Sequence, residues 1–239
     1  MNFANLVSQL MDGMGNTLLL FFSTLLFSLP LGLLVTFGRM SKWAPFAFLV
    51  RPGRPSGKAA RVLARFRPIE LVFRFLISIL RGTPLMLQIF LVFFGPYYIF
   101  KIRLSASYRI VAAILAFSIN YAAYFAEIFR SGIESIPAGQ YEAAQVLGYS
   151  KRQTFFKIIL PQMIKRVLPP VTNEVITLVK DTSLAFVIAY TEMFTVAKQI
   201  AAAKTTVYPL FVAGLFYFIF NAVVAWAMER IERSLAYYQ

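Results

Sequence analysis

The chain contains 26 consecutive residues, Gly13 to Gly38, without a single charged side chain. The stretch is dense in Leu and Phe from Thr17 to Phe37, and about 20 apolar residues are enough for a helix to cross a bilayer. A cleaved secretory signal peptide is the alternative, but no Lys or Arg precedes the stretch and no small-residue cleavage site follows it. We therefore expect a retained membrane span.

Four further stretches also predict membrane spans, although three of them carry polar or charged residues. The five expected spans cover about residues 14–37, 69–94, 108–131, 168–197 and 206–230. Composition agrees, because 59% hydrophobic residues, 14% charged residues and a mean hydropathy of +0.68 are unusual for a soluble domain. The sequence thus predicts an all-α membrane protein whose residues 1–239 form one transmembrane domain.

The Lys and Arg residues are distributed unevenly between the two sides of these spans. Sixteen of the 24 lie in segments 38–68 and 130–166 and in the tail after Met228, five lie on the other side, and three lie within spans. Because basic loops stay in the cytoplasm, the N-terminus is expected outside and the C-terminus in the cytoplasm. This topology, with contact to anionic lipid, accounts for the net charge of +14, so no nucleic-acid partner is expected.

The N-terminus and the first basic loop each lead to one further expectation. Phe3, Leu6, Val7 and Leu10 recur at helical spacing and predict a short helix on the outer membrane surface, with a frayed terminus as the alternative. The basic segment 53–59 superficially matches a phosphate-binding loop. It has three residues between its glycines instead of four, and Ala59 where Ser or Thr would hold magnesium. ATP hydrolysis is therefore expected in another chain.

The residues that are missing exclude several kinds of chemistry. The sequence has no Cys and no His, which excludes disulfides, thiol nucleophiles, serine-histidine triads and the commonest transition-metal sites. We expect no metal site and no covalent catalysis in this chain.

Segment 134–161, between the third and fourth spans, predicts two short helices joined by a sharp turn. Pro137 suits a first helical turn, and Gly148 can supply the left-handed residue that ends that helix. Ser150 and Gln153 fit a capping box for the second helix, which Pro161 is expected to stop. Its side chains Phe155, Phe156, Ile158 and Ile159 are expected to anchor the segment, which we call the elbow, against the bundle. A rigid cytoplasmic elbow suits docking to a partner protein.

Three sequence signatures in order resemble those of the permease subunits of bacterial ABC importers. The elbow carries Glu142-Ala143-Ala144, then Gly148, then a run that ends Ile-x-Leu-Pro, similar to the family's EAA loop. Segments 81–84 (Arg-Gly-Thr-Pro) and 180–184 (Lys-Asp-Thr-Ser-Leu) resemble the branch that takes up histidine, glutamine, glutamate and arginine. The resemblance extends from the first span to Arg233; its one departure is a longer Pro- and Gly-rich segment, 44–57.

This resemblance implies a type I ABC importer permease fold in a bacterial inner membrane. The implied partners are a dimer of ATPase subunits, which bind Mg-ATP, a second permease copy or homologue, and an extracytoplasmic solute-binding protein. Glu142, Ala143, Ala144 and Gly148 would couple the chain to the ATPase, with the small residues allowing close docking. Transport of a polar amino acid would proceed by alternating access, and the chain itself would not be an enzyme.

Polar residues within the expected spans fall on shared helix faces. At 100° per residue, Glu174, Asp181 and Glu192 lie within about 20° of one another, and Thr177 lies about 60° away. Asn120, Tyr124 and Glu127 form a similar group on the third span. Charges inside a membrane are costly and often functional, so these residues are expected to line a substrate pathway. Alternatively, they only satisfy one another and the intramembrane cations Arg74, Arg81 and Lys180.

Two further hypotheses follow from these charges. Arg81 and Asp181 are expected at about the same depth and are predicted to pair, directly or through a neighbouring polar group. The acids outnumber the cations, which favours a basic or neutral amino acid over glutamate or aspartate.

Two alternative functions remain. A small channel, or half of a secondary transporter, would not need the elbow. A membrane enzyme would need paired carboxylates in the loops, and the loops contain no such motif.

Overall fold

The computed structural model describes residues 2–49, 57–102, 105 and 107–235. The four longest helices are α1 (Phe3–Arg39), α5 (Tyr108–Glu134), α8 (Leu160–Asp181) and α10 (Tyr208–Leu235). The other α-helices are α2 (Lys58–Ala64), α3 (Pro68–Gly82), α4 (Leu85–Phe100), α6 (Ala138–Val146), α7 (Lys151–Thr154) and α9 (Met193–Lys204). Short 3₁₀ or π segments are η1 (Ala47–Leu49), η2 (Phe155–Ile159) and η3 (Thr182–Ile188). The described part of the chain is all helical, as the sequence predicts.

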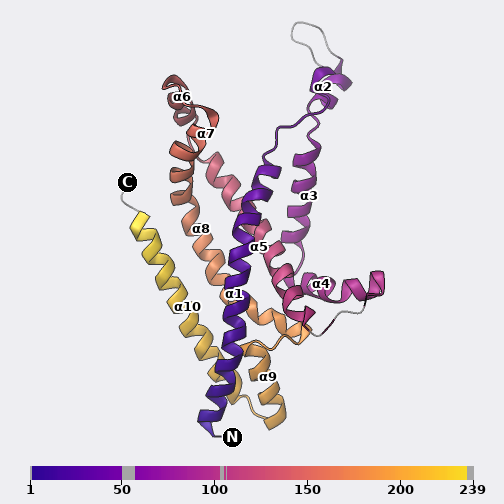
Figure 1. Cartoon of the computed structure of the whole chain (residues 1–239), viewed down its shortest axis with the longest axis vertical. Coiled ribbons are helices and arrows are strands. Elements are labelled where there is room, and N and C mark those ends of the chain that lie inside the picture. Colours follow the sequence, from indigo (N-terminus) through magenta and orange to yellow (C-terminus); the bar gives the residue numbers. More distant parts are fainter. Residues whose placement is uncertain (1, 50–56, 103–104, 106, 236–239) are drawn as a thin grey trace.

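The core forms where α1 and α5 run side by side (Figure 1). Small residues allow the close approach, because a Cβ added at Gly32 would lie only 2.8 Å from Cβ of Phe125. The Thr36 hydroxyl on α1 donates to the Ala126 carbonyl on α5 over 3.1 Å. Lipid tails are as apolar as the side chains of a membrane helix, so the hydrophobic effect does not drive such helices together. Close packing at small residues and interhelical hydrogen bonds hold them together instead.

The expected separate N-terminal surface helix does not exist. Residues Phe3 to Arg39 form one continuous helix, and Leu6 and Leu10 are buried against Met193 and Ala213 of α9 and α10. The helical spacing of the apolar residues was therefore correct, but the side chains contact neighbouring helices, which sequence periodicity does not distinguish from a membrane surface.

The predicted second span is broken in its middle. Helices α3 and α4 meet at Thr83 and Pro84 with a bend of 106°, and α4 lies across the bundle rather than along it (Figure 1). Pro84 has no N–H for a helical hydrogen bond and favours an extended residue before it, and Thr83 is extended, with φ −119° and ψ 146°. The span expected at 69–94 is therefore not one straight helix, and it counts as a single crossing only if the bent pair α3 and α4 is taken together.

The predicted fourth span is also interrupted. After α8 the chain tightens into η3, reaches Ala189 with a left-handed φ of 53°, and then starts α9. The helices on the two sides of this break differ in direction by 54°. By length and composition, three helices among the described residues can each cross a membrane alone, and up to five crossings result if each bent pair counts as one span.

The bundle has two distinct ends. Helix α1 begins near α9, whereas α6 and α7 lie at the opposite end, toward which α10 runs (Figure 1). This arrangement agrees with termini on opposite sides, and which end faces the cytoplasm stays a prediction. Segment 50–56, including most of the region compared with a phosphate-binding loop, lies outside the described residues.

Candidate functional site

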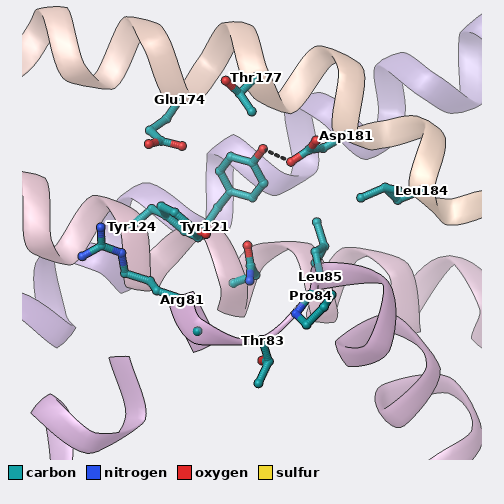
Figure 2. Close-up of a pocket in the computed structure, with 12 residues that line it drawn as sticks. Arg81, Thr83, Pro84, Leu85, Tyr121, Tyr124, Glu174, Thr177, Asp181 and Leu184 are labelled. Carbon is teal, nitrogen blue, oxygen red and sulfur yellow. Dashed lines mark hydrogen bonds between the residues drawn. The ribbon is translucent and has the colours of Figure 1, made fainter. Parts of the chain in front are cut away.

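A polar pocket of about 470 Å³ opens where the break between α3 and α4 faces α5 and α8 (Figure 2). Its lining is formed by Arg81, Gly82, Thr83, Pro84, Leu85, Asn120, Tyr121, Tyr124, Glu174, Thr177, Asp181 and Leu184. Five residues that the sequence predicts for the pathway are therefore brought together: Asn120, Tyr124, Glu174, Thr177 and Asp181. We call this the central pocket.

The broken helix shapes one wall of the central pocket. Because Pro84 cannot donate to the carbonyl of Leu80, this carbonyl needs other partners. Gln88 Nε2 donates to it over 2.8 Å and Asn120 Nδ2 over 3.1 Å, and Asn120 Nδ2 also donates to Gln88 Oε1 over 3.0 Å. Asn120 therefore holds the break in place as well as lining the pocket.

The charged groups of the central pocket are held by aromatic side chains. The Tyr121 hydroxyl donates to Asp181 Oδ2 over 2.7 Å, and the Arg81 guanidinium carbon lies 5.1 Å from the centre of the Tyr124 ring (Figure 2). Among the described residues, Arg81 and Asp181 form no ion pair, so a direct pairing is wrong: Asp181 accepts a hydrogen bond from Tyr121 instead.

Tyr121 lines the central pocket but is not among the residues that the sequence predicts for the pathway. It is buried and lies only about 60° around the helix from Tyr124, so a helical projection of α5 offered the signal. Phe117, Tyr124 and Phe125 of the same span are also aromatic, so residue type alone does not distinguish Tyr121.

Glu127 does not reach the central pocket. Its carboxylate pairs with Arg130 over 2.6 Å and lies 3.6 Å from Arg39 of α1, which in turn pairs with Glu70 of α3 over 3.1 Å. Glu127 lies three residues, nearly one helical turn, beyond Tyr124, at the level where α1 and α3 carry their own charges. Through these ion pairs it connects α1, α3 and α5, and it does not line the central pocket.

Glu192 is also absent from the pocket. The segment η3 and the left-handed Ala189 interrupt the helix between Asp181 and Glu192, so the two side chains no longer share one helix face. Its side chain is fully buried, accepts from the backbone N–H groups of Phe194 and Thr195 at 2.7 and 2.6 Å, and caps α9. Tyr217 of α10 donates to it over 2.8 Å. Glu192 is thus a structural connection between two helices.

The remaining intramembrane cations take different positions. Arg81 lines the central pocket, whereas Arg74 lies on the exposed face of α3 and Lys180 is exposed at the end of α8. Among the described residues no group of three or more acidic side chains is placed to hold a metal ion.

The elbow matches its predicted local structure at several points. Pro137 precedes α6, Gly148 has a left-handed φ of 75°, and the Tyr149 N–H returns to the Ala144 carbonyl over 3.0 Å. Ser150 and Gln153 form the predicted capping box. Local signals set this geometry because each contact joins residues only three to five positions apart.

Other expectations for the elbow need correction. Pro161 does not stop the helix: the chain continues through the π turn η2 into α8, and the wider turn accommodates the proline ring. Ile159 is buried, but Phe156 is exposed and does not anchor the segment. Ala144 is 1% exposed and packs within this chain, whereas Glu142 and Ala143 are exposed.

The sequence matches a known family over most of its length. The model of the family described as "binding-protein-dependent transport system inner membrane component" matches residues 57–237. The chain belongs to this family. It is therefore a multi-pass inner membrane permease component, a non-catalytic transport subunit of a system that includes an ATPase and a binding protein.

Curated relatives point to the amino-acid branch of these permeases. The L-cystine permease protein TcyB of Bacillus subtilis is 36% identical over 178 residues, 74% of each chain. The arginine permease protein ArtQ of the same organism is 36% identical, covering 72% of this chain and 78% of its own. The probable amino-acid permease protein YckA, also from Bacillus subtilis, is 36% identical over 95% of this chain and 88% of its own. The predicted resemblance to polar-amino-acid permeases is confirmed.

Solved structures agree with this assignment. A crystal structure of an amino acid ABC transporter with histidines superposes with a TM-score of 0.78 at 27% identity, covering 98% of this chain and 99% of its own. The MetNI methionine ABC transporter reaches a TM-score of 0.73 at 19% identity, over 99% and 100% of the two chains, which shows the shared fold alone.

The buried position of Glu192 leads to a prediction about stability. Replacing Glu192 by leucine should lower the free energy of unfolding by about 2 to 4 kcal/mol, because the N–H groups at the start of α9 and the Tyr217 hydroxyl lose their acceptor. Thermal unfolding of the purified permease complex would measure this loss. Glu229→Leu, at an exposed position of α10, is the control and should change the free energy of unfolding little. An equal loss of stability in the two variants would contradict the role assigned to Glu192.

Proposed function

We propose that this chain is the membrane-spanning subunit through which an ATP-driven importer takes up a polar amino acid by alternating access. The observation that carries the proposal is the central pocket, which brings two carboxylates, a guanidinium, two threonines and two tyrosines together beside breaks in two spans. Unwound backbone in membrane proteins is tolerated where it lines a cavity, and transporters bind substrates at such breaks.

The chemistry of the central pocket supports a zwitterionic or cationic substrate. Asp181 and Glu174 can accept hydrogen bonds from an ammonium group, and Arg81 can donate to a carboxylate. Two carboxylates face one guanidinium, so a basic or neutral amino acid is favoured over glutamate or aspartate, whose second carboxylate would be repelled. The names of relatives, which include cystine, arginine and glutamine permeases, are compatible with this range.

The proposed assembly contains two ATPase subunits that bind Mg-ATP, a second copy or homologue of this chain, and a solute-binding protein. Residues 1–239 act as one domain, with the N-terminus outside and the elbow and C-terminus in the cytoplasm. The exposed Glu142 and Ala143 contact the ATPase, and Gly148 sets the angle at which α6 meets it. Ala144 supports this surface from inside, since its side chain is buried.

Uptake by the complete complex tests the proposal. With ATPase and binding protein reconstituted in vesicles, arginine, histidine, glutamine, cystine and glutamate should be compared with and without ATP. We expect ATP-dependent uptake of a basic or neutral amino acid. Uptake that needs no ATP would favour a channel or secondary transporter, and preferred uptake of glutamate would contradict the substrate class.

Glu174 offers a specific test of the substrate charge. Replacing Glu174 by glutamine should reduce uptake of a cationic amino acid about tenfold, the effect of losing one charged hydrogen bond, and should reduce uptake of glutamine less. Glu229→Gln, outside the central pocket, is the matched control. Equal losses for cationic and neutral substrates would show that Glu174 does not sense substrate charge.

A further inference from the structure

A second cavity lies beside the elbow, separate from the central pocket. Its volume is about 750 Å³. It is lined by Gln140, Lys157, Ile158, Leu160, Pro161, Gln162, Ile164, Lys165, Arg166 and Leu235. These residues come from α6, from η2 and the first turns of α8, and from the end of α10. We call it the basic cavity.

The basic cavity concentrates positive charge. Three of its lining residues are Lys or Arg, and none of the described lining residues is acidic. Arg166 Nη1 donates over 2.5 Å to the carbonyl of Ser135, a neutral acceptor, and Arg166 forms no ion pair within the part of the chain that the structure describes. Lys157 lies 5.9 Å from the Tyr149 ring, which is also neutral. A compact anion is therefore the complementary ligand.

The basic cavity also has apolar lining residues. Ile158, Leu160, Pro161, Ile164 and Leu235 contribute no charged group. A cavity lined by both cations and aliphatic side chains suits a ligand with an anionic head and a hydrocarbon chain. A free inorganic anion would use only the cations.

The position of the cavity matches the headgroup layer of a bilayer. The charge-free part of α10, Tyr208 to Met228, is about 32 Å long at 1.5 Å per residue, close to the hydrocarbon thickness of about 30 Å. Leu235 lies about 10 Å further along the same helix, beyond the apolar part. Basic cavities between membrane helices at this level bind anionic lipid headgroups.

We propose that the basic cavity binds an anionic phospholipid, with Arg166 and Lys157 contacting the phosphate. The aliphatic lining residues would contact an acyl chain. The lipid would fill the angle between the elbow, α8 and α10. It would thereby connect the composition of the membrane to the segment that faces the ATPase. This proposal does not depend on which amino acid is transported.

Lipid titration of the purified complex, with ATPase subunits attached, tests the proposal. Phosphatidylglycerol binding, followed by native mass spectrometry, should weaken about fivefold in Arg166→Gln and by a similar factor in Lys157→Gln. Arg166→Lys keeps the charge and should retain most of the affinity, even though it changes the contact with Ser135. Arg230→Gln removes a guanidinium from α10 outside the cavity and should leave the site-specific affinity unchanged.

Two further arms identify the source of the anion. Phosphatidylcholine should not bind at the site, and inorganic phosphate at millimolar concentration should not displace phosphatidylglycerol. Displacement by inorganic phosphate would assign the cavity to a soluble anion instead. Equal affinity of all variants for phosphatidylglycerol, or binding only after the ATPase is removed, would overturn the proposal.

Discussion

Replacing Asp181 by asparagine is expected to reduce amino-acid uptake about tenfold to a hundredfold, the effect of losing a charge from a hydrogen-bonded group in a poorly solvated pocket. Asparagine keeps the shape of the side chain and can still accept the hydrogen bond from Tyr121, now 2.7 Å long, so the change isolates the charge. Uptake into vesicles containing the whole complex would measure it, with Asp12→Asn on the exposed start of α1 as control.

Two comparisons make this prediction specific. Tyr121→Phe leaves the charge of Asp181 but removes the hydroxyl that donates a hydrogen bond to it. Uptake should fall only a fewfold, because one such hydrogen bond contributes about 1 kcal/mol. The exchange of Arg81 and Asp181 should not restore transport, because Asp181 is bonded to Tyr121 and not to Arg81. Wild-type uptake by Asp181→Asn, or recovery in the exchanged double variant, would contradict this account of the pocket.

Replacing Gly148 by leucine should reduce substrate-stimulated ATP hydrolysis about tenfold or more, while the permease still inserts and assembles. Its φ of 75° is costly for a side chain with a Cβ, by about 1 to 2 kcal/mol, and nothing within 4 Å of the added Cβ would clash. The cost is therefore paid by rebuilding the end of α6, which changes the direction of the elbow.

Matched variants separate this backbone effect from a general disturbance of the elbow. Gly148→Asn should retain most of the coupled hydrolysis, since asparagine tolerates the left-handed conformation. Gly139→Ala, at an equally open position without a positive φ, should behave like the wild type. If Gly148→Asn is as defective as Gly148→Leu, side-chain bulk at the docking surface, and not backbone strain, is responsible.

The elbow illustrates what could be predicted from the sequence. Pro137, Gly148 and the pair Ser150 and Gln153 act on residues within one or two helical turns, so their effects are readable from the spacing alone. Pro161 was misread because a helix can absorb a proline by a wider turn, and neighbouring contacts decide whether it does so.

The central pocket illustrates the opposite case. A uniform helical projection placed Glu192 on the same face as Asp181, but η3 and Ala189 change both the turn angle and the direction of the chain between them. Glu127 fell on the correct face of α5, yet its partners Arg39 and Arg130 hold it at the charged end of the bundle. Periodicity gives the angle of a residue around its helix, whereas its partner depends on other helices.

The sequence by itself determined the membrane class, the approximate position of the apolar segments, the elbow and the family, because these depend on composition and on contacts between near neighbours. Only the tertiary structure decided that α3 and α4 bend apart at Pro84, that Tyr121 holds Asp181, and which acids face the central pocket. Pro84 favours a break locally, but the direction of α4 after it and the contact between Tyr121 and Asp181, which lie 60 positions apart, are set by helix packing and leave no local pattern in the chain.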